Sequence, residues 1–143
     1  MGIQRVVLVR GLPGSGKSTY AQSERFKGVH EFSPYRHYES DMYWIGSDGV
    51  YRFVLSDLRY AHEWCLDMTT TALEEGYSVV VSNTFTTLQE MQPYLDLAED
   101  YGIVPDVIHC CGQFNSVHGI PKETFDLMAG RWEPFPGETV YQP

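Results

Sequence analysis

The 143-residue sequence has few cysteines, few basic residues and no long apolar segment, and each shortage excludes a class of protein. The three cysteines, Cys65, Cys110 and Cys111, are odd in number and two are adjacent. This pattern does not suit a disulfide framework and favours a reducing compartment. No apolar run approaches the roughly 20 residues of a membrane span, and the N-terminus lacks a signal-peptide pattern. We therefore expect a soluble cytoplasmic protein.

Metal-ligand spacings are also missing, because the sequence contains neither a Cys-x-x-Cys nor a His-Glu-x-x-His arrangement. We therefore expect no zinc site built from protein ligands. Basic residues are scarce, since 10 lysines and arginines stand against 19 acidic residues. A protein that binds extended duplex nucleic acid needs a broad basic face, so we expect no such binding. Six of the basic residues fall within residues 1–36, which predicts contact with a polyanion over a short footprint.

Short apolar runs alternate with helical patterns along the chain, an order typical of a parallel sheet with helices on both faces. Strands are predicted at residues 3–9, about 37–40, 78–82 and 104–111. Helices are predicted from about Lys17, over residues 56–75, from a capping box at Thr87 and Glu90, and from Pro121. The last helix should turn Phe125 inward, and the tail, residues 133–143, is expected to be irregular. The sequence thus predicts one α/β domain over residues 1–143, with four to five strands.

The motif GLPGSGKST directly follows the first predicted strand. A glycine, four residues and then Gly-Lys-Ser form a complete P-loop pattern. The glycines allow a tight turn and a close approach of backbone N–H groups to phosphate, the lysine bridges the β- and γ-phosphates, and the serine hydroxyl ligates Mg²⁺. The predicted nucleotide-binding residues are Gly11, Leu12, Pro13, Gly14, Ser15, Gly16, Lys17, Ser18 and Thr19. An ordinary glycine-rich turn is the alternative, but it leaves the placement between a strand and a helix unexplained.

Further segments occur in an order that resembles a known family: LVRGLPGSGKST at 8–19, SDMY at 40–43, VVVSNT at 79–84, EMQPYLDLAEDYG at 90–102 and VHGIPKETFDLMAGRW at 117–132. The chain resembles the kinase domain of bacteriophage polynucleotide kinase and related short AAA-type P-loop proteins. The resemblance implies a P-loop NTPase fold, a three-layer α/β/α sandwich with a lid at about residues 112–132. It also implies that ATP and Mg²⁺ serve transfer of phosphate to a nucleic-acid 5′-hydroxyl end or a nucleotide-like small molecule. A phage-encoded protein in the host cytoplasm would fit this resemblance.

The resemblance assigns the general base to Asp41, because in that family an aspartate shortly after the second strand takes the proton from the attacking hydroxyl. A carboxylate at the carboxyl end of a strand, facing the phosphate loop, suits this step. A helix cap or a solvated surface acid is the alternative for Asp41. With Lys17 stabilising the migrating charge, Asp41 completes the predicted catalytic pair.

The sequence also departs from the family pattern. Trp44 stands where the phage enzyme has an arginine, Asn83 stands where it has an aspartate, and residues 111–121 contain no lid arginine. Arg131 is predicted to lie too far along the last helix to replace that arginine. These departures argue against an efficient kinase, because an arginine over the transferring group speeds phosphoryl transfer by several powers of ten in well-studied enzymes.

Contacts with the acceptor or lid are predicted for five residues: Tyr43, Trp44, Asn83, Asn115 and His118. Aromatic faces beside the base suit stacking of a nucleobase, although such rings also fill cores. The leading hypothesis is an ATP-dependent kinase acting on an alcohol. The second is a nucleotide-dependent interaction protein with weak NTPase activity, which the missing arginine favours and Asp41 opposes.

Overall fold

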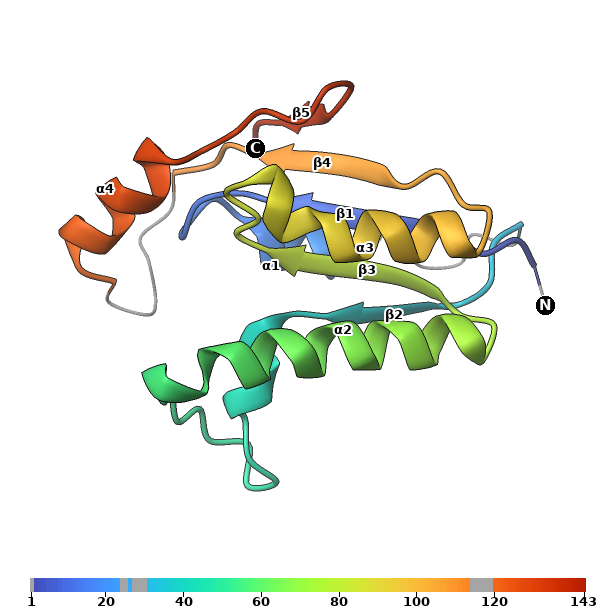
Figure 1. Ribbon diagram of the computed structural model, residues 1–143, viewed down its shortest axis with the longest axis horizontal. Helices are drawn as coiled ribbons and strands as arrows, with labels where there is room; N and C mark the ends of the chain where they lie inside the picture. Colours follow the sequence, from blue (N-terminus) through green and yellow to red (C-terminus); the bar gives the residue numbers. More distant parts are fainter. Residues whose placement is uncertain (1, 24–25, 27–30, 114–119) are drawn as a thin grey trace.

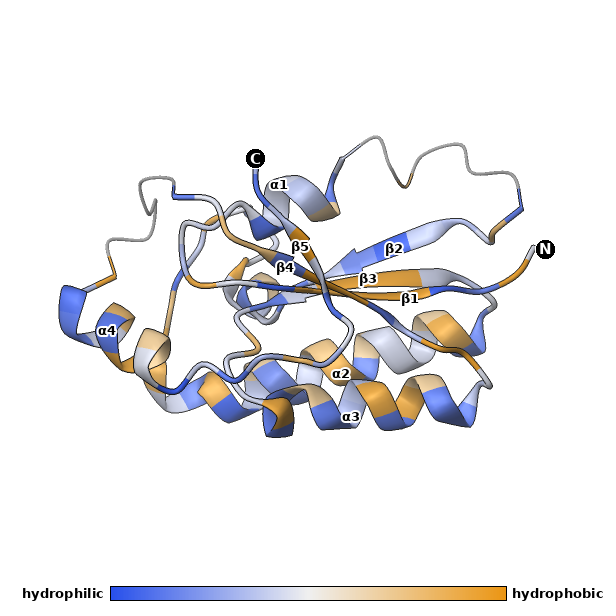
Figure 2. Ribbon diagram, turned by 90° about the horizontal axis from the view of Figure 1, so that it is seen from above, coloured by the Kyte–Doolittle hydropathy of each residue, from blue (hydrophilic) through white to orange (hydrophobic). Residues whose placement is uncertain are grey.

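The sheet of this protein has five parallel strands in the order β2-β3-β1-β4-β5, as seen in a computed structural model that describes residues 2–23, 26, 31–113 and 120–143. The strands are β1 (Val6–Arg10), β2 (Tyr35–Tyr38), β3 (Ser78–Asn83), β4 (Asp106–Cys110) and β5 (Thr139–Tyr141). The helices are α1 (Lys17–Ala21), α2 (Leu58–Glu74), α3 (Leu88–Asp100) and α4 (Lys122–Gly130), with short 3-10 helices η2 (Ser40–Trp44) and η3 (Leu55–Asp57). The α1 helix lies on one face of the sheet, and α2 and α3 cover the other (Figure 1 and Figure 2). The predicted α/β fold is confirmed.

Strand β1 is buried on both faces, which explains the continuous apolar run in its sequence. Successive side chains of a strand point to opposite faces. Val6 and Leu8 accordingly pack in the cluster formed with α2 and α3, whereas Val7 and Val9 pack in the cluster beside α1. Figure 2 shows the apolar strands between these two layers. Because all strands are parallel, their carboxyl ends meet at one edge of the sheet.

Local signals set the ends of the helices. The predicted capping box is confirmed, because the Thr87 hydroxyl accepts from the Glu90 amide at 3.2 Å while the Glu90 carboxylate accepts from the Thr87 amide. At the end of α2, Gly76 adopts a left-handed φ of 92°, a conformation that glycine allows without strain. In the part of the chain that the structure describes, no helix is both long and apolar enough to cross a membrane.

Two predictions for the C-terminal region are wrong. The tail contains a strand, β5, which pairs in parallel with residues 108–110 of β4. Because this strand is only three residues long, it depends on the available edge of β4 rather than on a local pattern. Phe125 is not turned inward, because it is 37% exposed and α4 contains no buried residue. Helix α4 extends beside the sheet edge instead of lying on a face (Figure 1).

Candidate active site

The phosphate-binding motif forms a tight turn at the carboxyl end of β1. Gly14 and Gly16 have φ values of 80° and 94°, in the left-handed region that favours glycine. A methyl group on Gly11 would come within 2.7 Å of the Cys110 carbonyl oxygen and would also collide with the Ser15 hydroxyl, so only glycine fits there. The turn and the helix that begins at Lys17 therefore have the local geometry that the motif predicts.

Backbone bonds fasten this loop to its surroundings. The Ser15 amide donates to the Leu12 carbonyl at 3.1 Å, which closes the turn and engages one of the backbone N–H groups that were predicted to approach phosphate. The Ser15 carbonyl accepts from the Gly112 amide at 3.0 Å, and the Gly11 amide donates to the Thr84 carbonyl at 3.2 Å. The loop is thereby held to the segments that follow both β3 and β4.

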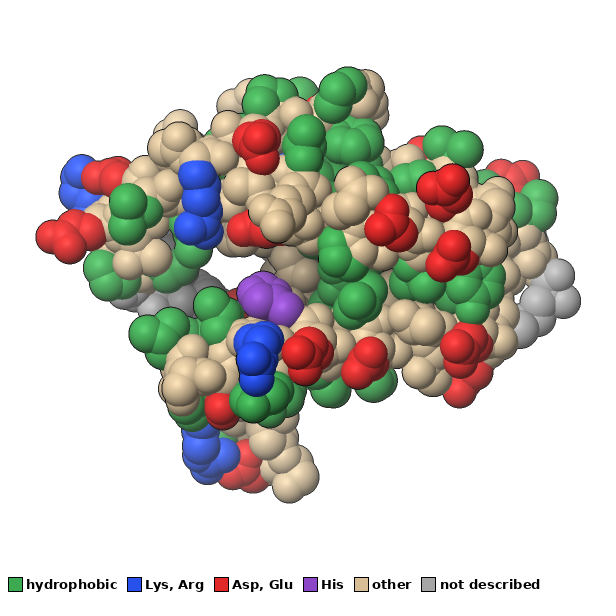
Figure 3. Space-filling model, viewed as in Figure 1, with side chains coloured by type: hydrophobic (Ala, Val, Ile, Leu, Met, Phe, Trp, Pro, Cys, Tyr) green, Lys and Arg blue, Asp and Glu red, His purple; other side chains and the backbone are tan. Residues whose placement is uncertain are grey.

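Lys17 and Asp41, the predicted catalytic pair, both follow strands at this edge of the sheet, Lys17 after β1 and Asp41 after β2. The Lys17 ammonium bends back over the loop, 3.4 Å from the Leu12 carbonyl oxygen. Burial lowers the pKa of Lys17, while the negative charges of Glu39 and Asp41 act in the opposite direction. Figure 3 shows the molecule hollowed between α4 and the N-terminal end of α2, beside this edge.

Asp41 lies in η2, three residues after β2 ends, rather than at the tip of a strand over residues 37–40. Asp41 is exposed, and one of its carboxylate oxygens is 3.4 Å from the Tyr51 hydroxyl. Tyr51 reaches this position because residues 45–51 form a hairpin closed by an antiparallel bridge between Ile45 and Tyr51. Asp41 is thus accessible to an acceptor and has an aromatic neighbour.

Asn83 holds η2 against the end of β3. Its side-chain oxygen accepts from the Ser40 amide at 2.9 Å, and its side-chain nitrogen is 3.8 Å from the Cys65 sulfur. The Ser40 hydroxyl is in turn 3.0 Å from His62 Nδ1. Asn83 therefore contributes to the site by fixing the residue that precedes Asp41.

Glu39 is a site residue that the sequence analysis missed. Its carboxylate bonds with the side chains of Ser18 and Ser82 and lies 3.2 Å from His37 Nε2. Burial alone would raise the pKa of Glu39, but the hydrogen bonds from His37 and Ser18 outweigh it and lower the pKa below its usual value. An available signal was the two-residue period of a strand, which places His37 and Glu39 on one face.

The aromatic residues around Asp41 divide between packing and exposure. Trp44 is only 6% exposed, and its ring lies 4.7 Å from Phe53 and 6.4 Å from Tyr51 between centroids. Trp44 therefore packs the base of the hairpin and does not offer a surface to an acceptor, in agreement with the alternative that some of these rings fill the core. Tyr43 and Tyr51 are 37% and 38% exposed and present aromatic surface near Asp41.

Asn115 and His118, two of the predicted lid residues, lie outside the described residues. Arg131 follows α4, and its Nε donates to the Thr86 hydroxyl at 2.8 Å. Its guanidinium is also 3.9 Å from a Glu90 oxygen. Since Thr86 lies just after β3, Arg131 contacts the carboxyl-end edge of the sheet even though it stands at the far end of the lid helix.

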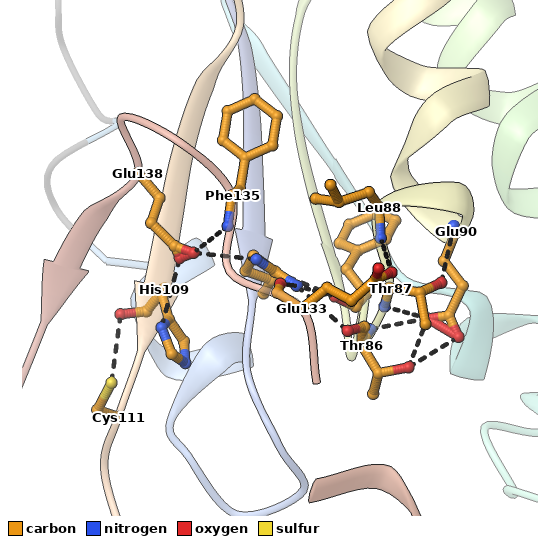
Figure 4. Close-up of polar contacts among 11 residues, drawn as sticks. Thr86, Thr87, Leu88, Glu90, His109, Cys111, Glu133, Phe135 and Glu138 are labelled. Carbon is orange, nitrogen blue, oxygen red and sulfur yellow. Dashed lines mark hydrogen bonds and ion pairs between the residues drawn. The ribbon is translucent and has the colours of Figure 1, made fainter. Parts of the chain in front are cut away.

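A buried arginine links the P-loop strand to the C-terminal segment. Arg10 is fully buried and donates to the carbonyl oxygens of Phe85 at 2.6 Å and Glu133 at 2.7 Å. Its guanidinium also pairs with Glu138 at 2.9 Å and lies over the Trp132 ring, 4.1 Å from the centroid. Figure 4 shows these two glutamates of the C-terminal segment: Glu133 lies near Thr86 and Leu88, and Glu138 lies near His109. The chain after α4 is thereby fastened to the strand that carries the phosphate loop.

His109 makes this network sensitive to acid. Its ring stacks on Trp132, 4.5 Å between centroids, and its Nδ1 is 3.5 Å from Glu138. Burial lowers the pKa of His109, Glu138 raises it and Arg10 lowers it further, with a net decrease. The unfolded chain therefore binds a proton at His109 more readily than the folded chain, and stability should fall as the pH drops below about 6.5.

We therefore expect His109→Gln to reduce the loss of unfolding free energy between about pH 7.5 and pH 5. Urea unfolding at both pH values measures this difference. An identical pH dependence in His109→Gln would contradict the role assigned to His109.

Comparison with known proteins assigns this arrangement to a family. Residues 6–113, from β1 to just beyond β4, match the AAA domain family. The chain belongs to this AAA domain family. The matched region contains the phosphate loop, Asp41 and Glu39, whereas α4 and the tail of this AAA domain protein lie outside it.

Curated relatives are similar over most of the chain. Human NEDD4-binding protein 2 is 29% identical over 140 residues, which cover 91% of this chain and 8% of the human protein. The bifunctional polynucleotide phosphatase/kinase of Schizosaccharomyces pombe is 28% identical over 106 residues, which cover 74% of this chain and 21% of that enzyme. The AAA domain protein described here thus spans less than a quarter of either relative.

Solved structures support the fold assignment. The APS kinase CysC of Mycobacterium tuberculosis, in complex with AMPPNP and APS, matches with a TM-score of 0.66 and 19% identity, covering 100% of this chain and 90% of that one. At this level of identity the similarity concerns the fold. The AAA domain protein therefore has the P-loop kinase fold, and the phage origin stays a prediction.

Proposed function

We propose that this AAA domain protein is a kinase that transfers the γ-phosphate of ATP to an alcohol in the presence of Mg²⁺. The observation that carries the proposal is the placement of the phosphate loop after β1 and of the exposed Asp41 after β2, at the shared carboxyl-end edge of one parallel sheet. A cation for the phosphates and an exposed base for the acceptor then face the same opening. The kinase names of a curated relative and of a structural neighbour give further support.

The proposed reaction uses these two side chains in separate roles. Lys17 and the amides that begin α1 hold the phosphate chain and stabilise its negative charge. The acceptor oxygen attacks the γ-phosphorus as the bond from that phosphorus to the bridging oxygen of ADP breaks. The proton of the acceptor hydroxyl passes to a carboxylate oxygen of Asp41, which Tyr51 contacts at 3.4 Å.

The donor atoms at the loop also fit Mg²⁺. The Ser18 hydroxyl and the Glu39 carboxylate bond with each other, and oxygen atoms of this kind are what Mg²⁺ prefers. No group of three or more histidine, cysteine or acidic residues that could hold a metal occurs among the described residues, so the phosphates would supply part of the coordination. When bound, the ion would neutralise charge on the phosphates.

We assign the acceptor to the class of nucleic-acid 5′-hydroxyl ends and nucleotide-like small molecules. Tyr43 lies on η2, two residues from Asp41, and Tyr51 lies on the hairpin and contacts Asp41, so both exposed rings offer a surface on which a base can stack. The net charge of −9 disfavours binding along a duplex and favours a small or end-bound acceptor.

A transfer assay tests this proposal. The protein is incubated with γ-labelled ATP, Mg²⁺ and a panel of 5′-hydroxyl oligonucleotides, nucleosides and small polyols. We expect label on a member of the nucleotide-like group, and Lys17→Ala should reduce its rate of formation by at least about 10²-fold. Arg36→Ala is the basic control, because that guanidinium lies over the Tyr77 ring, 3.9 Å from its centroid, rather than beside the loop. Transfer to no acceptor would contradict the kinase assignment.

One observation favours the second hypothesis, a nucleotide-dependent interaction protein. Arg131 is bonded to Thr86 and lies near Glu90, so the arginine at the end of the lid already has partners. Release of free phosphate without labelled acceptor, at a rate unchanged by Asp41→Asn, would support this hypothesis.

A further inference from the structure

The Glu39 carboxylate beside the phosphate loop, which fits Mg²⁺, neither binds the acceptor nor takes a proton in the transfer step described above. Glu39 directly follows β2, its side chain is only 17% exposed, and its carboxylate lies 3.2 Å from His37 Nε2 and bonds with the Ser18 hydroxyl. Buried charges are costly, so they are kept where partners or bound ions compensate them. Three neutral or weakly basic partners, Ser18, Ser82 and His37, provide this compensation in the structure.

Three other polar side chains at this edge, those of Asn83, Ser82 and Asp41, have partners of their own. Asn83 uses its oxygen on the Ser40 amide and its nitrogen on the Cys65 sulfur. The Ser82 hydroxyl is 2.7 Å from His37 Nε2. Asp41 is exposed and is turned to the Tyr51 hydroxyl. Glu39 is therefore the acid that shares a hydrogen bond with the loop serine.

We propose that Glu39 is the carboxylate of the metal–nucleotide site and acts there with the Ser18 hydroxyl, either on the ion or on its water shell. The inference rests on the proposed function, because it requires that ATP occupies the loop. In this role, the charge of Glu39 makes the affinity for ATP depend on the divalent ion. Without the ion, the carboxylate repels the phosphates; with the ion, it attracts the complex.

This mechanism predicts effects of opposite sign in one variant. In EDTA, Glu39→Gln should bind ATP more tightly than the unmodified protein, because a repulsive charge is removed. In Mg²⁺, it should bind ATP more weakly, because a carboxylate at the metal is lost. We expect the ratio of the dissociation constants in EDTA and in Mg²⁺ to fall by about 10–100-fold.

Isothermal titration calorimetry with ATP, in EDTA and in Mg²⁺, measures this ratio without any catalytic turnover. Glu75→Gln is the matched control, since Glu75 is exposed and lies just beyond the far end of α2. Glu39→Asp keeps the charge on a shorter side chain and should give an intermediate ratio; it carries the test if circular dichroism shows that Glu39→Gln is poorly folded. The hyperfine spectrum of Mn²⁺ in the ATP complex is a second readout and should change in Glu39→Gln.

The outcomes separate this inference from the proposed function. An unchanged ratio in folded Glu39→Gln, with ATP still bound, would overturn the role of Glu39 and leave the kinase proposal standing. Weaker binding of equal size in EDTA and in Mg²⁺ would also overturn it, because that result indicates a structural role. If the unmodified protein binds no ATP under either condition, both proposals fail together.

Discussion

Replacing Asp41 with asparagine should lower the rate constant for phosphate transfer to an alcohol by about 10²–10⁴-fold. Asparagine preserves the shape of the side chain, but its amide cannot take the proton from the attacking hydroxyl. Asp41 is exposed and lies outside the loop that holds the phosphates, so the variant should not weaken ATP binding. Single-turnover transfer of label and calorimetric titration of ATP measure the two properties separately.

Asp100→Asn provides the matched control for this measurement. Asp100 is an exposed aspartate at the C-terminal end of α3, at the opposite end of the sheet from Asp41 (Figure 1). It should transfer phosphate at the rate of the unmodified protein. A rate in Asp41→Asn within about twofold of that rate would remove Asp41 as the general base, since loss of a general base costs far more than this.

The fold was predictable from sequence where local pattern and long-range structure agree. Strands β1 and β3 are continuous β-branched runs because both of their faces are buried, and such runs are recognisable in a sequence. Strand β5 was missed because it has one neighbour, β4, and three residues, so its formation depends on an available edge. The orientation of α4 was predicted wrongly because an apolar residue at helical spacing does not reveal whether a surface exists to cover it.

The candidate site was predictable only in part, for a related reason. The P-loop is local, so its glycines, Lys17 and Ser18 are readable from their spacing. Glu39 and Asn83 acquire their contacts from the alignment of β2, β3 and the loop, which brings together residues more than 40 positions apart in the sequence. Arg10 directly follows the strand predicted at residues 3–9, and its partners come from segments more than 70 residues away.

Arg10→Met should lower the free energy of unfolding by about 3–5 kcal/mol, a large share of the stability of a small domain. Methionine fills much of the buried volume but leaves Glu138 without its closest cation, at a carboxylate that is only 9% exposed. It also removes both hydrogen bonds to the Phe85 carbonyl, where the backbone holds a φ of 47° that non-glycine residues rarely adopt. Urea unfolding followed by circular dichroism measures the change.

Arg5→Met is the control, because Arg5 directly precedes β1 and is partly exposed. It tests whether the loss of unfolding free energy in Arg10→Met comes from the burial of Arg10 or from the loss of any arginine in this part of the chain. Arg5 pairs with Asp106 at the same kind of distance, 2.7 Å, but the two side chains are 30% and 50% exposed. Exposed pairs contribute at most about 1 kcal/mol, so Arg5→Met should be much milder than Arg10→Met. Adding Glu138→Gln to Arg10→Met should restore part of the loss, because the uncompensated charge is then gone. Equal costs for the two arginine variants would show that the buried ion pair does not hold the C-terminal segment to the phosphate-loop strand.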